Sequence, residues 1–139
     1  MRPIEVSTDR ARQDVDAIHA YLTRSYWAEG VTRERVAKSL ERSLCFGLFD
    51  GARQIGFARV VTDATTFAYL ADVYVLEEYR GRRLGEELVR EMVENGPYTN
   101  VRWILHTTNM HALYRKFGFE EPDYKVMERR PIRNSSESG

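Results

Sequence analysis

The chain has 139 residues, and its 21 Lys and Arg residues equal its 21 Asp and Glu residues in number, so the formal net charge is zero. This length predicts a single domain, and the balanced charge excludes a protein that binds nucleic acid or an anionic membrane through its overall charge. The single cysteine, Cys45, excludes an intrachain disulfide framework.

The two ends of the chain and its apolar runs predict a cytoplasmic protein without membrane spans. The N-terminal stretch MRPIEVSTDR lacks the apolar segment of a signal peptide, and no apolar run reaches the roughly 18 residues that a membrane span requires. The C-terminal stretch NSSESG is small and polar. We therefore expect one domain over residues 1–130 and a flexible tail over residues 131–139.

The first half of the chain predicts one strand, two helices and a β-hairpin. Residues 3–7 are expected to form the strand, and apolar residues at helical spacing predict an amphipathic helix over residues 9–24. A shorter helix is expected near residues 31–42. The apolar runs 44–49 and 54–61 flank an Asp-Gly step, which is typical of a hairpin.

The second half of the chain alternates strands and helices. Residues 67–76 are almost continuously apolar, which predicts a strand covered on both faces. An amphipathic helix is expected to begin near Leu84, followed by a strand over residues 101–105 and a short helix over residues 110–117. Residues 124–129 are expected to form a last strand. Because hairpins and crossover helices both occur in this order, the sequence predicts an α/β fold with a mixed sheet.

A positively charged loop that contains glycine joins the strand at 67–76 to the next helix. Its six residues are Arg80, Gly81, Arg82, Arg83, Leu84 and Gly85. A helix N-terminus presents unpaired N–H groups, glycine lets a backbone come close to a ligand, and arginine adds positive charge. The spacing fits neither the nucleotide P-loop nor the dinucleotide fingerprint. The residues alone leave two alternatives open, a phosphate or pyrophosphate site and a solvated arginine turn that caps the helix.

Two stretches of the sequence resemble motifs of the GNAT superfamily of N-acetyltransferases. The stretch VYVLEEYRGRRLGEELV is similar to the acetyl-CoA motif of that family, which has Arg or Gln, two residues, Gly, one residue and then Gly or Ala. Arg80 fills the first position and Gly85 the last, whereas Arg83 replaces the middle glycine. The stretch HALYRKFGFEE resembles the tyrosine-bearing helix of the family and places Tyr114 on its tyrosine.

The resemblance implies a GNAT-like mixed central sheet of about six to seven strands flanked by four helices. In that family the sheet is splayed, here between the strands at 67–76 and 101–106, and the co-substrate acetyl-CoA fills the gap. Backbone N–H groups near Val75 and Leu76 would polarise the thioester, and Thr107 stands where the family often has asparagine. The implied acetyl-CoA contacts are Val73, Val75, Leu76, Arg80, Gly81, Arg82, Arg83, Leu84, Gly85, Thr107 and Asn109.

The resemblance also implies the reaction, a direct acetyl transfer from acetyl-CoA to a primary amine of a small molecule or peptide. Tyr114 would be the general acid that protonates the CoA thiolate. Judged from the residues alone, a tyrosine on a short amphipathic helix is more simply a core residue.

Asp72 is the one charged residue in an otherwise apolar strand. A buried carboxylate is costly unless it is paired or hydrogen-bonded, so one alternative is a structural ion pair with an arginine or a contact with a helix N-terminus. The other alternative is a catalytic role beside the thioester, as a binder of the acceptor amine or as general base. Strand alternation would place Asp72 on one face with Leu70, Tyr74 and Leu76.

The segment SYWAEG joins the first two predicted helices and contains Tyr26, Trp27 and Glu29. In the family this connection usually lines the acceptor pocket, and aromatic walls with one carboxylate would suit an organic amine. The alternative is that Trp27 packs the two helices together.

The cysteine and the histidines do not indicate a metal site. No Cys and His cluster has metal-ligand spacing, so no metal is expected. A histidine beside the site could relay a proton, although His19, His106 and His111 are each interpreted as a surface residue or a satisfied core residue.

The resemblance also allows a homodimer, because dimers are common among the relatives. A non-catalytic CoA-binding or regulatory module on the same fold is the alternative function, since Arg83 and Thr107 depart from the motifs.

Overall fold

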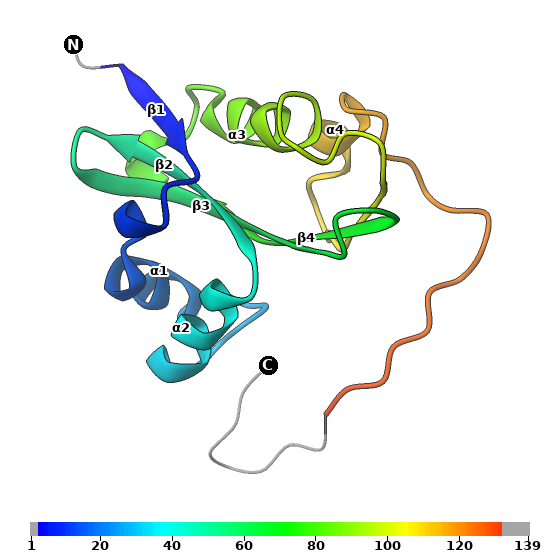
Figure 1. Cartoon of the computed structure of the whole chain (residues 1–139), viewed down its shortest axis with the longest axis horizontal. Helices are drawn as coiled ribbons and strands as arrows, with labels where there is room; N and C mark the ends of the chain where they lie inside the picture. The colour runs from blue at the N-terminus through cyan, green and yellow to red at the C-terminus, as the bar shows by residue number, and fades with distance from the viewer. Residues whose placement is uncertain (1–2, 132–139) are drawn as a thin grey trace.

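The computed structural model describes residues 3–131 and contains one five-stranded sheet with helices on both faces (Figure 1). The strands lie side by side in chain order. Their bounds are β1 (Ile4–Ser7), β2 (Leu44–Asp50), β3 (Arg53–Thr62), β4 (Phe67–Val75) and β5 (Arg102–Leu105). Strands β1 to β4 are antiparallel to their neighbours, whereas β5 pairs with β4 in parallel, so the predicted mixed sheet is confirmed.

Figure 1 shows helices α1 and α2 on one face of the sheet and helices α3 and α4 on the other. The bounds are α1 (Val15–Leu22), α2 (Arg33–Glu41), α3 (Leu84–Val93) and α4 (His111–Arg115), with short 3₁₀ helices η1 (Arg10–Arg12) and η2 (Glu77–Tyr79). No helix within the described part of the chain is long and apolar enough to cross a membrane. Apart from Pro131, the predicted tail lies outside the described residues.

The first predicted helix is divided into two shorter ones. Asp9 accepts a hydrogen bond from the Ala11 N–H at 3.0 Å and begins η1, and Asp14 accepts one from the Ala17 N–H at 3.0 Å and begins α1. An aspartate in this position starts a helix, because its carboxylate satisfies an N–H group that has no partner within the helix. The continuous helix predicted over residues 9–24 is therefore wrong.

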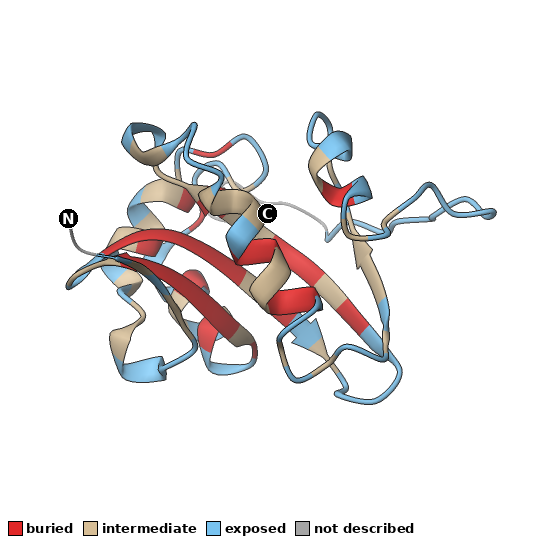
Figure 2. Cartoon of the chain, turned by 90° about the horizontal axis from the view of Figure 1, so that it is seen from above, coloured by how far each residue is buried: buried red, intermediate tan, exposed pale blue. Residues whose placement is uncertain are grey.

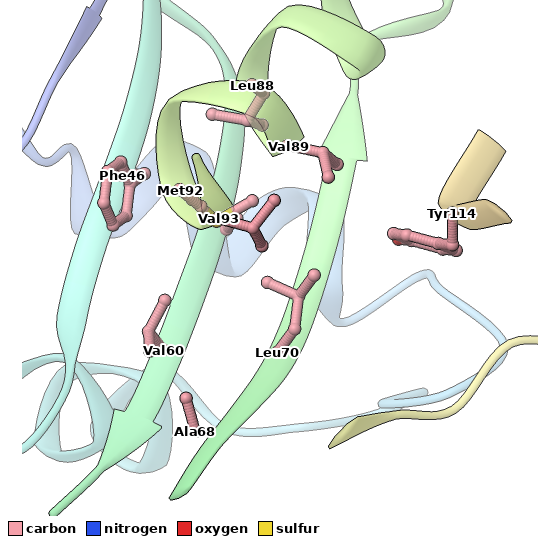
Figure 3. Packing of buried hydrophobic residues seen from close by; sticks show 10 residues of the cluster. Phe46, Val60, Ala68, Leu70, Leu88, Val89, Met92, Val93 and Tyr114 are labelled. Carbon is pink, nitrogen blue, oxygen red and sulfur yellow. The ribbon is translucent and has the colours of Figure 1, made fainter. Parts of the chain in front are cut away.

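Two clusters of apolar side chains hold the helices on the sheet. Figure 2 shows that the buried residues are concentrated along the central strands and on the inner sides of the helices. The α3 cluster includes Leu70 of β4 with Leu88 and Val89 of α3 (Figure 3). The α1–α2 cluster, on the opposite face, includes Ile18 and Val36. Full burial of one such aliphatic side chain contributes about 1.5–3 kcal/mol, so the clusters fix these helices against the sheet.

Strand β4 contains a bulge near its centre. Between two register pairs, one residue of β3 faces two residues of β4, Asp72 and Val73. Asp72 has a φ of 57°, in the left-handed region, which aspartate tolerates better than most residues. The extra residue reverses the alternation, so Leu70 packs in the α3 cluster and Tyr74 in the α1–α2 cluster. The prediction that Asp72 shares one face with both residues is therefore wrong.

Strands β4 and β5 are paired over a short distance and then separate. The register pairs run from Phe67 with Arg102 to Leu70 with Leu105. Beyond this point β4 continues to Val75, whereas β5 has ended. The predicted splay between these strands is confirmed, and it opens at the end of the last pair.

The described residues contribute five strands to the sheet, fewer than the expected number of about six to seven. Residues 124–129 have no regular secondary structure, so the last predicted strand is wrong. The side chains of Tyr124, Val126 and Met127 in this segment are exposed. An apolar pattern does not by itself form a strand, because a strand also needs a hydrogen-bonded neighbour.

Candidate functional site

A cleft of about 1350 Å³ lies where β4 and β5 separate. Most of the predicted site residues line it: Tyr26, Trp27, Asp72, Val73, Val75, Arg80, Gly81, Arg83, Leu84, Gly85, Thr107, Asn109 and Tyr114. Three predicted residues, Glu29, Leu76 and Arg82, lie outside this lining. The cleft therefore brings together the charged loop, the tyrosine of α4 and the segment between α1 and α2.

The charged loop forms one part of the cleft wall, where α3 begins. Gly81 has a φ of 83°, and a side chain added there would meet no atom within 4 Å. At Gly85, the nearest atom to an added Cβ would be Val75 Cγ2, at 3.9 Å. Both glycine positions border open space, so a phosphate group could approach the backbone N–H groups of the loop and of the first turn of α3.

Two of the three loop arginines line the cleft. Arg80 is held in place by a hydrogen bond from its Nη2 to the Tyr21 hydroxyl of α1, at 2.9 Å. Arg83 lines the same wall. The Arg82 guanidinium instead lies 5.4 Å from the centre of the Tyr79 ring, outside the lining. An anion in the cleft would therefore meet two of these cations rather than three.

Replacing Arg83 with Gly is expected to raise the free energy of unfolding by about 0.5 kcal/mol. Arg83 is the N-cap residue of α3, with a φ of 58° and no capping hydrogen bond from its side chain. A left-handed residue with a Cβ costs about 1–2 kcal/mol, whereas the greater freedom of glycine in the unfolded chain costs about 0.5–1 kcal/mol. Urea unfolding measures the difference. Arg83→Ala, which keeps the strain but removes the charge, is the control, and a glycine variant less stable than this control would contradict the prediction.

One backbone N–H group of β4 is directed into the cleft. The Leu76 N–H donates to the Ile55 carbonyl of β3 at 2.8 Å, so it is already engaged. Val75 pairs with Gly56 in the same ladder, and successive N–H groups of an antiparallel strand point in opposite directions. The Val75 N–H therefore points away from β3, towards the side on which β5 has ended.

Tyr114 is both a core residue and part of the cleft wall. It is 8% exposed, and its ring meets the Phe119 ring edge to face with centroids 5.7 Å apart. Figure 3 shows the ring projecting from α4 towards the α3 cluster. Burial raises the pKa of Tyr114 to about 12, and the nearby Tyr26 adds a smaller effect in the same direction. The hydroxyl is therefore protonated at neutral pH and can act as a donor.

Asp72 is held between an arginine and a tryptophan. Its Oδ2 accepts a hydrogen bond from Arg59 Nε at 2.9 Å, and its Oδ1 accepts one from Trp27 Nε1 at 3.0 Å. The side chains of Arg59 and Asp72 are 20% and 14% exposed, so the ion pair is largely buried. The structural alternative for Asp72 is thus present, and the same carboxylate also borders the cleft. The sequence did not identify Arg59, because its pairing depends on the register of β3 against β4.

The segment between α1 and α2 bridges the two sides of the cleft. Trp27 is bonded to Asp72 of β4, and the Tyr26 hydroxyl lies 3.1 Å from the Thr108 hydroxyl, which follows β5. Trp27 is 38% exposed, and its ring centre lies 6.3 Å from that of Tyr21 in α1. Glu29 is exposed and does not line the cleft.

Two further contacts in the cleft were not predicted from the sequence. The Thr107 hydroxyl accepts a hydrogen bond from the Met110 N–H at 3.0 Å, so it has a local role at the start of α4. The Tyr69 hydroxyl and His106 Nδ1 lie 2.7 Å apart. The first contact joins residues three positions apart in the turn before α4, whereas the second contact depends on strand register. Among residues 3–131, no group of three or more His, Cys, Asp or Glu side chains could hold a metal ion.

Comparison with known proteins points to one family. The family model of the acetyltransferase (GNAT) domain matches residues 41–121. A curated protein of Gibberella zeae, named "Putative acetyltransferase", is 30% identical over 88% of this chain and 81% of the relative. The crystal structure of "a putative acetyltransferase belonging to the gnat family" from Xanthomonas campestris pv. campestris has a TM-score of 0.88 and 38% identity, and the match covers 94% of this chain and 95% of that chain.

A more distant structure bears on the fold alone. It is a "predicted acetyltransferase with acetyl-CoA" from Clostridium acetobutylicum, with a TM-score of 0.68 and 14% identity. The similarity covers 93% of this chain and 96% of that chain. The arrangement of strands and helices is therefore shared over nearly the whole length of both chains.

Proposed function

This chain belongs to the GNAT acetyltransferase family, and we propose that it transfers the acetyl group of acetyl-CoA directly to a primary amine of a small molecule or peptide. The observation that carries the proposal is the cleft between the separated strands, which is lined by the loop before α3, by Val75 and by Tyr114. An extended acyl donor in this cleft would meet an anion-binding loop, a backbone N–H group and a proton donor. These groups meet the main demands of acyl transfer from a thioester.

The shape and charge of the cleft suit acetyl-CoA. The pantetheine arm would lie along β4 beyond Leu70 and would take the place of the missing strand neighbour. The glycine positions of the loop, with Arg80 and Arg83, would hold the pyrophosphate. Thr107 and Asn109 line the facing wall, where we expect them to contact the arm.

Two groups would act on the thioester itself. The Val75 N–H would donate to the carbonyl oxygen, which becomes more negative as the amine attacks, and a donor of this kind contributes about 10²–10³ in rate. Tyr114 would give its hydroxyl proton to sulfur as the carbon–sulfur bond breaks. Burial raises the pKa of Tyr114 to about 12, so the hydroxyl still carries its proton at neutral pH when the thiolate forms.

The acceptor amine would enter from the α1–α2 side of the cleft. Tyr26 and Trp27 form an aromatic wall there, next to Asp72. The Asp72 carboxylate is already shared between Arg59 and Trp27. Because both of its oxygens already accept hydrogen bonds, we assign Asp72 to binding and positioning the ammonium group through its charge rather than to removing the proton.

Asp72→Asn is expected to lower kcat/KM for the amine by about tenfold and to leave the acetyl-CoA Kd unchanged. Asparagine keeps the shape, tolerates the left-handed φ of 57° and can still accept the Trp27 hydrogen bond, but it removes the negative charge. Loss of the charged contact with Arg59 is expected to lower the free energy of unfolding by about 1–3 kcal/mol. Steady-state kinetics, calorimetry and urea unfolding measure the three quantities. Parallel losses of stability and acetyl-CoA affinity, with kcat unchanged, would indicate a purely structural role.

A non-catalytic CoA-binding or regulatory module is the second candidate function. It is favoured by Arg83, which occupies a left-handed position suited to glycine, and by Thr107, whose hydroxyl already contacts Met110. A homodimer, expected from the resemblance, stays a prediction that sedimentation would test.

The first experiment is calorimetric titration with acetyl-CoA, with free CoA and ATP as controls. The second is acetyl-CoA turnover with four probe amines, namely tyramine, spermidine, glycinamide and a lysine-containing peptide. Binding with turnover of any probe supports the enzyme, and binding without turnover supports the module. No binding of acetyl-CoA would contradict both functions.

A further inference from the structure

His106 and Tyr69 form a hydrogen-bonded pair in the wall of the cleft. His106 Nδ1 and Tyr69 Oη lie 2.7 Å apart, and the two rings meet edge to face with centroids 5.5 Å apart. Both residues line the cleft. Leu105 is the last residue of β5 that pairs with β4, so His106 stands at the point where the strands begin to separate. The pair therefore lies at the apex of the gap. Val75 lies about 10 Å farther along β4, because its partner in β3, Gly56, is three residues from Arg59, which faces Ala71.

The pair lies on the acceptor side of the sheet. The neighbours of Tyr69 in β4, Ala68 and Leu70, belong to the α3 cluster, so Tyr69 and the imidazole bonded to it lie on the opposite, α1–α2 face. Tyr114 belongs to the α3 cluster. A thioester held between the strands would have the imidazole of His106 on one side and the proposed proton donor on the other.

We propose that His106 is the base that removes the proton from the acceptor ammonium group, an assignment that rests on the acetyl transfer proposed above. An ammonium nitrogen has no free electron pair and cannot attack a thioester until it loses a proton. Imidazole ordinarily exchanges protons near neutral pH, and His106 is exposed, so the proton can pass on to water. Tyr69 is a positioning residue, because it acts by fixing the imidazole ring.

The hydrogen bond to Tyr69 is compatible with either tautomer of His106, because a tyrosine hydroxyl can donate or accept. When Nδ1 carries the hydrogen and donates to Tyr69 Oη, Nε2 keeps a lone pair for the ammonium proton. In the opposite tautomer Nε2 is a donor and cannot act as a base. Burial raises the pKa of Tyr69, so its hydroxyl stays protonated and can take either role in the hydrogen bond. The proposal therefore requires the tautomer with hydrogen on Nδ1 of His106.

The proposed step balances in protons and electrons. Nε2 takes one proton from the ammonium group through a bridging water molecule and releases it to bulk water. The free amine forms a nitrogen–carbon bond to the thioester carbonyl carbon, and the carbon–sulfur bond breaks with its electron pair moving to sulfur. Sulfur takes the Tyr114 proton, and the Tyr114 oxygen regains one from water. The proton lost by the new amide nitrogen leaves through the same imidazole, so the net products are an amide, CoA thiol and one proton.

Charged and titratable side chains surround the pair. Besides burial, Asp72 of β4 and Glu128 of the C-terminal segment raise the pKa of Tyr69, whereas Arg59 of β3 lowers it. Asp72 and Arg59 are paired with each other. From the segment between α1 and α2, the Tyr26 hydroxyl faces Thr108. Glu128 is paired with Arg130 of its own segment at 2.9 Å and does not line the cleft. Glu128→Gln is therefore a necessary control, because it removes the one charge of this set that lies outside the Arg59–Asp72 pair.

The tautomer can be measured without any acceptor. At about pH 8.5, where imidazole is neutral, nitrogen NMR distinguishes a bare ring nitrogen from one that carries hydrogen. We expect a bare Nε2 in His106. His19 is an internal reference for the opposite state, because its Nε2 lies 3.0 Å from the Val31 carbonyl oxygen, which can only accept. A hydrogen on His106 Nε2 would overturn the assignment, and Tyr69→Phe should remove the preference.

His106→Asn is expected to lower kcat/KM for the fastest of the four probe amines by about a hundredfold at neutral pH, with unchanged acetyl-CoA affinity. The loss should shrink as the pH rises towards the pKa of the probe amine, because the free amine then forms without a base. His111→Asn is the matched control, since His111 is exposed and lies outside the cleft lining. This control and Glu128→Gln are expected to keep the wild-type pH profile.

The kinetic outcomes separate two kinds of failure. If the wild-type protein turns over none of the probes, the proposed function itself fails. If it turns over a probe and His106→Asn keeps both the rate and the pH profile, only the assignment of His106 fails. Tyr69→Phe is expected to give a smaller loss with a displaced pH profile, and an unchanged profile would remove the positioning role of Tyr69.

Discussion

Tyr114→Phe is expected to lower kcat for acetyl transfer by about a hundredfold, because the departing sulfur would lose its proton donor. The acetyl-CoA Kd should stay unchanged, since the variant removes only a hydroxyl group. The ring keeps its place in the α3 cluster and its contact with Phe119. Steady-state kinetics with the fastest probe amine, together with calorimetry, would measure both quantities.

Tyr124→Phe is the matched control for this variant, because Tyr124 is 50% exposed and lies outside the cleft. An unchanged kcat in Tyr114→Phe would leave Tyr114 as a core residue only. Folding adds a pH dependence, because burial raises the pKa of Tyr114 from its ordinary value of about 10 to about 12. Its contribution to stability is therefore present below about pH 10 and is lost as the pH rises through about 12.

Gly85→Val is expected to weaken acetyl-CoA binding by about a hundredfold, equivalent to about 2.7 kcal/mol. An added Cβ at Gly85 would have only Val75 Cγ2 within reach, at 3.9 Å, so the unliganded fold leaves room for a Cβ there. It would fill the space next to the first turn of α3, where we propose that the pyrophosphate binds. Calorimetry measures the affinity, and thermal unfolding shows whether the fold is kept.

Gly85→Ala is the companion variant. Alanine in a helix is more favourable than glycine by about 1 kcal/mol, and Gly85 is the second residue of α3. We therefore expect a more stable protein with a smaller loss of affinity than in the valine variant. Unchanged acetyl-CoA affinity in both variants would exclude this part of the loop as the pyrophosphate site.

The local motifs were predictable because their chemistry lies in adjacent residues. The loop from Arg80 to Gly85 and the helix of Tyr114 each carry their signal within a few positions, and both line one cleft. The mixed sheet and its splay followed from the order of strands and helices and from the family resemblance. Helix boundaries were less accurate, because Asp14 could be interpreted as a helix residue as well as an N-cap.

Features that depend on strand pairing were not predictable from one sequence. The bulge at Asp72 arises from the register between β3 and β4, and it reverses the faces of the residues that follow. The partner of Asp72, Arg59, is determined by the same register. Likewise, Tyr69 and His106 come together only because β5 lies beside β4 in parallel.

The short pairing of β5 with β4 has a consequence for how the molecule opens and closes. Strands β2 to β4 form a meander of sequence neighbours, whereas β5 joins after the α3 crossover through the pairs that end at Leu70 and Leu105. Contacts between sequence neighbours form readily, and a parallel pairing across a crossover forms late. The seam between β4 and β5 is therefore expected to open more readily than the longer ladders of β2 with β3 and of β3 with β4. A ligand that bridges the seam would supply the hydrogen bonds that the sheet lacks, and amide exchange along β5 would then slow when the cleft is occupied.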